Sequence, residues 1–141
     1  MREILFRAKR TDNGEWAEGD LRQDRDLKTD YISGWDYYAT EGGLEREPFE
    51  YEVEPETLCQ YTGKSDEDGK KIFEGDIVGF IDLYSTESGY SESSCLGEVV
   101  WSEEECCFHV TNRLSAESFE VLDECKVVGN VFDNPELIEE Q

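Results

Sequence analysis

The sequence predicts a mainly β protein with little helix, in the form of a sandwich or a small barrel. Apolar and polar residues alternate over many short stretches, which is the pattern of half-buried strands. Turn-forming clusters separate these stretches, and short strands with regular turn signals are typical of sandwiches and barrels. A chain of 141 residues is expected to form one domain, or two small lobes that share a core.

Two stretches show the alternation most clearly. EILFRA (3–8) places Ile4, Phe6 and Ala8 on one face of an extended segment, and FEYEV (49–53) alternates aromatic or aliphatic residues with glutamates. Further strand candidates are YISGWDYYAT (31–40), GEVVW (97–101), CCFHV (106–110), SFEVL (118–122) and KVVGNVF (126–132). Helical periodicity is convincing nowhere, and only ELIEEQ (136–141), which follows Pro135, is expected to form a helical turn.

The stretch DEDGKKIFEGDIV (66–78) has three possible interpretations: a calcium loop, a phosphate cradle or a β-hairpin. An EF-hand with Gly69 at loop position 6 would place Lys64 at position 1 and Gly75 at position 12, where a ligand and a bidentate Glu are needed. A phosphate cradle needs Gly-Lys-Ser/Thr at the start of a helix, whereas Gly69 precedes residues that favour strands. The hairpin is therefore the favoured interpretation.

The hairpin interpretation makes two local predictions. Asp68 and Gly69 are expected to take positive φ at the centre of a type I′ turn, whose twist suits the flanking strands. Gly75 and Asp76 are expected to form a second bend, or a bulge, that redirects the chain. Farther along, DLYSTESGYSESSC (82–95) is rich in Ser, Gly and Glu, and is expected to be a long mobile loop.

The charge is strongly negative. The chain holds 36 acidic and 13 basic residues, a net charge of −23. Residues 1–63 hold 16 acids and 8 bases (−8), and residues 64–141 hold 20 acids and 5 bases (−15). Because affinity for nucleic acid depends largely on Lys and Arg that neutralise phosphates, direct binding to nucleic acid or to an anionic membrane is disfavoured.

The sequence contains no apolar run of the length of a membrane span, and the stretch MREILFRAKR lacks a signal-peptide pattern. A cytoplasmic location is therefore expected. The five cysteines are odd in number and form no C-x-x-C pair, so we expect reduced, mostly packed thiols rather than a disulfide framework or a zinc knuckle. They are Cys59, Cys95, Cys106, Cys107 and Cys125.

In the stretch CCFHV, both metal binding and a Cys-His nucleophilic pair must be considered. Strand alternation puts Cys107 and His109 on one face, but two ligands do not complete a zinc site, and adding Cys95 or Cys125 is unconstrained. A catalytic Cys-His pair needs a positive environment, whereas residues 103–105 are all Glu and read as a solvated turn. No common catalytic motif is present, so the sequence predicts no catalytic, cofactor-binding or metal-binding residues and no enzyme.

Three blocks of the sequence resemble the signatures of the YopX family, small uncharacterised proteins of bacteriophages and prophages. They are REILFRA (2–8), QYTGKSDEDGKKIFEGDIV (60–78) and VVGNVFDNPELI (127–138). The resemblance implies an SH3-like small β-barrel for the middle and tail of the chain, and supplies no established activity. The sequence departs most from the family signatures over residues 22–56 and 82–95.

These observations together give a domain plan and two candidate functions. Residues 57–132 are expected to form the barrel, residues 1–56 to add strands to it, and residues 133–141 to form a tail. The favoured function is a non-enzymatic phage or prophage accessory protein that binds a host or phage protein. Its acidity suggests a mimic of nucleic acid. The alternative is a metal-dependent hydrolase that uses the acidic residues. No cofactor is expected, and homo-oligomerisation would cover exposed strand edges.

Overall fold

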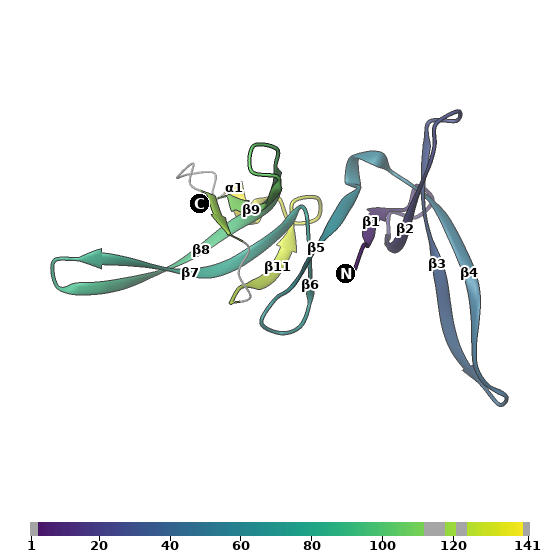
Figure 1. Cartoon of the computed structure of the whole chain (residues 1–141), viewed down its shortest axis with the longest axis horizontal. Coiled ribbons are helices and arrows are strands. Elements are labelled where there is room, and N and C mark those ends of the chain that lie inside the picture. Colours follow the sequence, from purple (N-terminus) through teal and green to yellow (C-terminus); the bar gives the residue numbers. More distant parts are fainter. Residues whose placement is uncertain (1–2, 112–117, 121–123, 140–141) are drawn as a thin grey trace. The chain divides into compact units, whose positions relative to one another are not determined.

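The computed structural model describes residues 3–111, 118–120 and 124–139, and over these residues the fold is mainly β (Figure 1). Contacts divide the chain into two compact units, residues 1–61 (unit 1) and residues 62–141 (unit 2). In the part of the chain that the structure describes, no helix has the length and apolar character needed to span a bilayer.

Unit 1 is one antiparallel sheet with the strand order β4-β3-β2-β1-β5. Its strands are β1 (Phe6–Lys9), β2 (Trp16–Asp24), β3 (Thr29–Thr40), β4 (Gly43–Val53) and the start of β5 (Cys59–Ser65). A 3-10 turn, η1 (Pro55–Thr57), connects β4 to β5. The strands predicted over residues 3–8, 31–40 and 49–53 are confirmed here, although Ile4 precedes β1 and is exposed.

The core of unit 1 comes from the alternating positions of these strands. Ala8, Ala17, Ile32 and Val53 are buried together, and partly buried side chains pack around them. Those partly buried side chains are Phe6, Leu21, Phe49, Tyr51 and Leu58. Since period-two burial on one face is what a half-buried strand requires, the alternation in FEYEV and EILFRA gave the correct core face.

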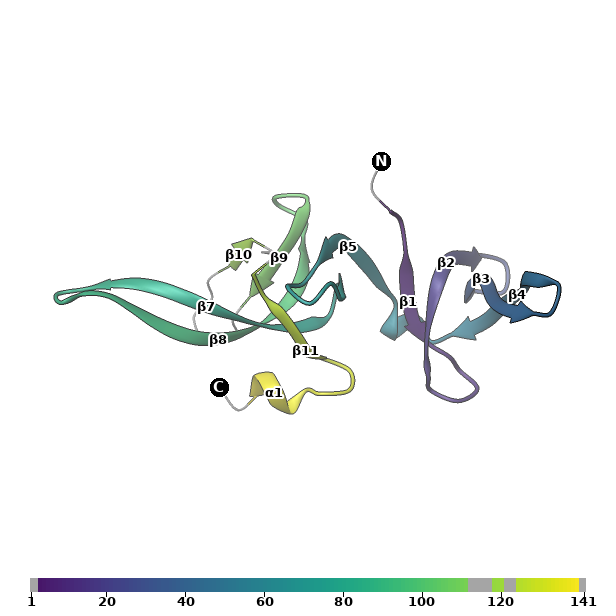
Figure 2. The same cartoon turned by 90° about the horizontal axis from the view of Figure 1, so that it is seen from below.

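Unit 2 contains a five-stranded antiparallel sheet with the order β10-β9-β8-β7-β11, and β5 is hydrogen-bonded to the short strand β6 (Figure 2). The strands are β6 (Lys71–Phe73), β7 (Asp76–Thr86), β8 (Gly89–Ser102), β9 (Cys107–Thr111), β10 (Ser118–Glu120) and β11 (Lys126–Asn130). The predicted strand GEVVW lies within β8, and KVVGNVF contains the whole of β11 and two further residues that form a turn. Residues 121–122 of the predicted strand SFEVL lie outside the described residues.

The core of unit 2 is formed by five buried residues, with Phe80, Phe108 and Val127 packed against them. The five are Ile72, Val78, Val99, Val110 and Cys125. The chain passes from β6 to β7 through Gly75, whose φ is +85°, so the predicted second bend is confirmed. The predicted helical turn is also present as α1 (Glu136–Glu139), within the described part of residues 136–141.

The SH3-like barrel predicted for residues 57–132 is not confirmed, because the strands of the described residues form two open sheets. β5 pairs with β1 of unit 1, and β11 forms an edge of the five-stranded sheet. On β11, Val127 donates a backbone hydrogen bond to the Asp66 side chain, where barrel closure would need a further strand. The boundary between the units falls inside β5, and the division at residues 56/57 and 132/133 stays a prediction.

The long mobile loop predicted over residues 82–95 is wrong. β7 and β8 pair continuously from Ile77↔Glu98 to Thr86↔Gly89, and form a long hairpin with a tight end (Figure 1). Gly89, with φ of +126°, begins β8 at that end. The composition misled the prediction because Ser, Gly and Glu are common in loops, yet they are also accommodated in paired strands, where cross-strand neighbours decide stability.

Candidate functional site

The turn between β5 and β6 holds the acidic stretch that suggested calcium. Gly69 has φ of +82°, and its N–H donates to the Asp66 carbonyl oxygen at 3.0 Å. Asp68 is not at positive φ, so the predicted type I′ turn is wrong. The hairpin itself is present, with a five-residue connection, Asp66–Lys70, in place of the two-residue one.

The carboxylate of Asp66 serves this turn as an acceptor. Its Oδ1 accepts the N–H groups of Asp68 (3.0 Å) and Lys70 (2.9 Å), and its Oδ2 accepts the N–H of Val127 (3.0 Å). These bonds, the one from Val127 above all, hold the pKa of Asp66 below its usual range, although burial acts in the opposite sense. Because both oxygens are engaged, this side chain has a structural role.

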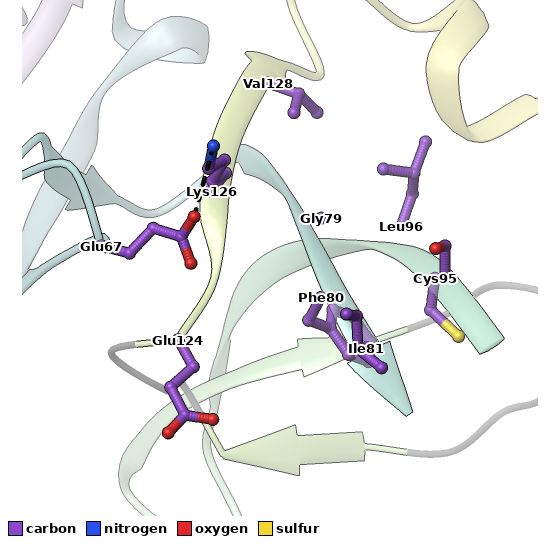
Figure 3. Close-up of a pocket in the computed structure, with 10 residues that line it drawn as sticks. Glu67, Gly79, Phe80, Ile81, Cys95, Leu96, Glu124, Lys126 and Val128 are labelled. Carbon is purple, nitrogen blue, oxygen red and sulfur yellow. Dashed lines mark ion pairs between the residues drawn. The ribbon is translucent and has the colours of Figure 1, made fainter. Parts of the chain in front are cut away.

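A groove of about 370 Å³ lies along β7, β8 and β11 in unit 2 (Figure 3). Leu96 and Val128 line it beside Gly79, and Lys126 extends toward Glu67, with 3.3 Å between Nζ and Oε1. The hydrogen bond with Glu67 raises the pKa of Lys126. Both partners are exposed, so this pair contributes little to stability.

The β8–β9 turn brings Cys107 and His109 together, as strand alternation predicted. Cys107 Sγ lies 3.0 Å from His109 Nε2, and the turn adds Glu105, whose Oε2 lies 2.9 Å from the same nitrogen. Cys106 takes φ of +55° in this turn and is exposed, as is Cys107, so these two thiols are not packed as predicted. Cys95 and Cys125 do not join this group, since only Glu105, Cys107 and His109 converge among the residues described.

The geometry argues against a Cys-His-Glu catalytic triad. In such a triad one imidazole nitrogen faces the nucleophile and the other faces the carboxylate. Here the same nitrogen, His109 Nε2, faces both Cys107 Sγ and Glu105 Oε2. Because both Cys107 and Glu105 face one nitrogen, the three side chains are arranged to share a bound ion or a proton. They are not arranged to pass a proton from the thiol through the imidazole to the carboxylate.

The β3–β4 hairpin extends well beyond the core of unit 1 as a two-stranded arm (Figure 1). We define the arm as residues 35–48, all of which are exposed. Trp35 pairs with Pro48, and Tyr37 pairs with Arg46. Because directly paired residues share a face of a sheet, these four residues and Leu44 form one face, which we call the aromatic face.

The large side chains of the aromatic face are exposed to solvent. The exposed fractions are 46% for Trp35, 63% for Tyr37 and 72% for Leu44. The Arg46 guanidinium lies over the Trp35 ring, 4.0 Å from its centroid. The opposite face of the arm carries the acidic side chains Asp36, Glu45 and Glu47, and also Tyr38, whose hydroxyl donates to Glu45 Oε2 at 3.2 Å. One side of the arm therefore carries Trp35 and Tyr37 with one cation, Arg46, and the other side is mainly acidic.

At the base of the arm, Asp20, Ser33 and Glu50 form a row across β2, β3 and β4 on the same side as Trp35. Together with Trp35 and Pro48 they line a shallow groove of about 410 Å³. Arg22 pairs with Glu50 through two hydrogen bonds (2.9 and 3.1 Å), whereas Asp20 has no ion-pair partner among the residues described. The groove thus combines an indole with a carboxylate that is available to a cation.

Sequence reasoning missed the arm, although a signal was present. Along β4 the face that carries Phe49 and Tyr51 continues with Glu47 and Glu45 toward the hairpin end. This change from aromatic to acidic residues marks the point where the hairpin leaves the core. Past that point the other face holds Trp35 and Tyr37, which have no core to cover them.

The fold and these sites define a mainly β protein of two units, each built on an open antiparallel sheet, with an exposed aromatic arm on unit 1 and a Cys-His-Glu cluster on unit 2. The chain belongs to the YopX protein family, whose model matches residues 5–139. No curated protein matches it.

Among solved structures, the chain is similar to the crystal structure of protein EF1440 from Enterococcus faecalis. The sequences are 24% identical, the match covers 98% of this chain and 99% of that chain, and the TM-score is 0.54. A likeness at this identity supports the fold. It assigns no activity.

Proposed function

We propose that this protein is a non-enzymatic binding module that engages a basic surface of another protein through the aromatic face of its arm. The observation that carries the proposal is the exposure of Trp35, Tyr37 and Leu44 on one face of a hairpin that extends beyond the core. Tyr, Trp and Arg are the residues that contribute most binding energy at protein interfaces. Exposed contiguous apolar surface with a polar surround is typical of an interaction site.

The chemistry around Trp35 favours a cationic partner. An indole beside a carboxylate attracts Lys and Arg through cation–π and ionic interactions, and Asp20 lies in the same groove as Trp35. Arg46, stacked on Trp35 in this chain, is an internal example of the contact that a partner's arginine would make. The net charge of −23 extends the same preference over the whole molecule and would speed encounter with a basic surface.

An extended basic surface is the electrostatic footprint of a nucleic-acid-binding protein, so the partner class that we propose is such a protein of a bacterial host or phage. In this proposal the acidic chain competes with nucleic acid for that surface. A net charge of magnitude about 2 to 8 suffices for the solubility of a small domain, and this chain exceeds it. The excess supports competition with nucleic acid.

The alternative of a metal-dependent hydrolase has one supporting observation, the cluster of Glu105, Cys107 and His109. Hydrolysis also needs a concave site that holds substrate beside the metal and excludes water. None of the three residues lines either groove described above, and two of them are exposed. The arm therefore supports a binding function better than the cluster supports hydrolysis.

The test compares partner capture by the wild-type chain, by the double variant Trp35→Ser with Tyr37→Ser, and by the control Tyr90→Ser. Tyr90 is an exposed aromatic residue on β8 of unit 2, so its replacement removes similar surface away from the arm. Proteins captured from a bacterial lysate are identified, purified and measured pairwise over a range of salt concentrations, with and without competing nucleic acid.

We expect a basic protein to bind wild type and the Tyr90→Ser control equally, to lose at least tenfold in affinity for the arm variant, and to bind less tightly as salt rises. Equal affinity for the arm variant and wild type would refute the arm as the binding surface. A ternary complex of this protein, the partner and nucleic acid would refute the competition with nucleic acid, but it would leave the arm as the binding surface. Self-association that the arm variant abolishes would identify a second copy as the occupant in place of a basic partner.

A further inference from the structure

We infer that Glu105, Cys107 and His109 form a binding site for one thiophilic divalent ion of the Zn²⁺ class, held at the β8–β9 turn of unit 2. The three ligand atoms, Oε2, Sγ and Nε2, lie within 4.8 Å of one another. The inference is independent of the arm, which belongs to unit 1.

The hairpin register explains why these side chains converge. Cys107 pairs with Ser102, and His109 pairs with Val100, so Cys107 and His109 project from the same face of β9. The core residues Val99 and Val110 pair on the opposite face, which keeps the cluster outside the core. The turn supplies Glu105, whose N–H bonds to the Ser102 hydroxyl at 3.3 Å. Sequence alternation accounts for two ligands, and the shape of the turn provides the third.

The spacing suits a small ion after a modest adjustment. In tetrahedral zinc sites with bonds of about 2.0 to 2.3 Å, ligand atoms lie roughly 3.4 to 3.6 Å apart. Nε2 lies 2.9 Å from Oε2 and 3.0 Å from Sγ, so these pairs need to open by about half an ångström around an ion. Rotation of the exposed side chains of Glu105 and Cys107 provides this movement without a change in the backbone.

The ligand types determine which ion the cluster prefers. Thiolate and imidazole favour Zn²⁺ and related transition metals, whereas Mg²⁺ and Ca²⁺ prefer sites made only of oxygen ligands. When a divalent ion binds, the Cys107 thiol releases its proton to solvent, and the thiolate and the Glu105 carboxylate together balance the two positive charges.

The site is supported on one side and open on the other. The His109 side chain, on strand β9, is 12% exposed, whereas that of Glu105 is 65% exposed. Three protein ligands leave a fourth position, which water or a ligand from a partner would fill. The neighbouring Glu103 and Glu104 add negative charge that attracts cations, although they also create a background of weak binding that the test must separate.

The test titrates Co²⁺, and then Zn²⁺ in competition with a chelator, into the full chain in a buffer with excess Mg²⁺ and a non-thiol reductant. The variants are Cys107→Ser, His109→Gln and Glu105→Gln. The matched controls are Cys106→Ser, which removes the adjacent exposed thiol, and Glu104→Gln, which removes the adjacent carboxylate. Circular dichroism verifies that each variant is folded.

We expect one Co²⁺ per wild-type chain, with a thiolate-to-cobalt charge-transfer band in the near ultraviolet. Cys107→Ser should abolish the band, and each of the three variants should weaken Zn²⁺ binding by about tenfold or more. The two controls should stay within about twofold of wild type. The inference is refuted if wild type gives no such band, if Cys107→Ser binds Zn²⁺ as tightly as wild type, or if Glu104→Gln weakens binding as much as Glu105→Gln.

Discussion

The carboxylate of Asp66 accepts a hydrogen bond from the backbone N–H of Val127, 61 residues farther along the chain. The same carboxylate accepts two N–H groups of its own turn, so one buried side chain connects the β5–β6 turn to strand β11. A second bond, from the Glu67 N–H to the Cys125 carbonyl at 3.0 Å, strengthens this connection. Within unit 2, Asp66 and Glu67 of the acidic stretch therefore connect the β5–β6 turn to the segment that leads into β11.

Replacing Asp66 with Ala should lower the free energy of unfolding by about 2 kcal/mol or more, because three N–H groups lose a charged acceptor. Asp66→Asn should cost less, since its amide oxygen keeps one acceptor. The measurement is the midpoint of denaturant unfolding, with the exposed Asp68→Asn as control. An Asp66→Ala midpoint equal to that of the control would contradict this structural role.

The same bonds predict a pH dependence. The pKa of Asp66 is lower in the folded chain than its ordinary value, so its contribution is fully present above the unfolded pKa of about 3.9 and is lost as pH falls through the folded value. The stability difference between wild type and Asp66→Asn should therefore be constant above about pH 5 and shrink below about pH 4. Unfolding of both proteins at a series of pH values measures it. A difference that grows on acidification would contradict the assignment.

The sequence correctly predicted features that depend on local residue patterns. It failed to predict features that depend on pairing between segments far apart in the chain. Alternation in EILFRA and FEYEV identified the core face of unit 1, and the Gly75 bend was correct. Barrel closure depends on which strands pair, and the β1–β5 pairing has no local signature. At the cluster, alternation placed Cys107 beside His109, but Glu105 reaches them only through a turn in which Cys106, a residue other than glycine, takes positive φ.

Gly69 provides a test of the turn geometry. Its φ is +82°, and a Cβ built there would meet nothing within 4 Å, so any cost of substitution comes from the backbone. Gly69→Val should lower the free energy of unfolding by about 1 to 3 kcal/mol, whereas Gly69→Asn should cost less, because Asn tolerates positive φ. Denaturant midpoints of the two variants measure this difference. Equal midpoints for Val, Asn and Gly would show that the turn adopts another conformation in solution.

The five thiols should differ in reactivity. Cys106 and Cys107 are exposed, Cys95 is partly buried, and Cys59 and Cys125 are buried. Titration of the native, metal-free protein with a thiol reagent should therefore give two fast thiols and a slower third, and denaturation should give all five. The control Cys106→Ser should lose one fast thiol. Fewer than five thiols in denatured, reduced protein would reveal a disulfide or another modification.

The arm predicts a separation between stability and binding. Trp35 and Tyr37 lie beyond the core, so Trp35→Ser with Tyr37→Ser should leave the unfolding midpoint nearly unchanged while lowering the affinity for the partner at least tenfold. Ile32 lies on the same strand but is fully buried in the core, so Ile32→Ala should cost about 2 to 5 kcal/mol. Denaturant unfolding of the three proteins, followed by a binding measurement on those that fold, makes the comparison. If the arm variant is destabilised as strongly as Ile32→Ala, the aromatic face is packed in solution and is not a free docking surface.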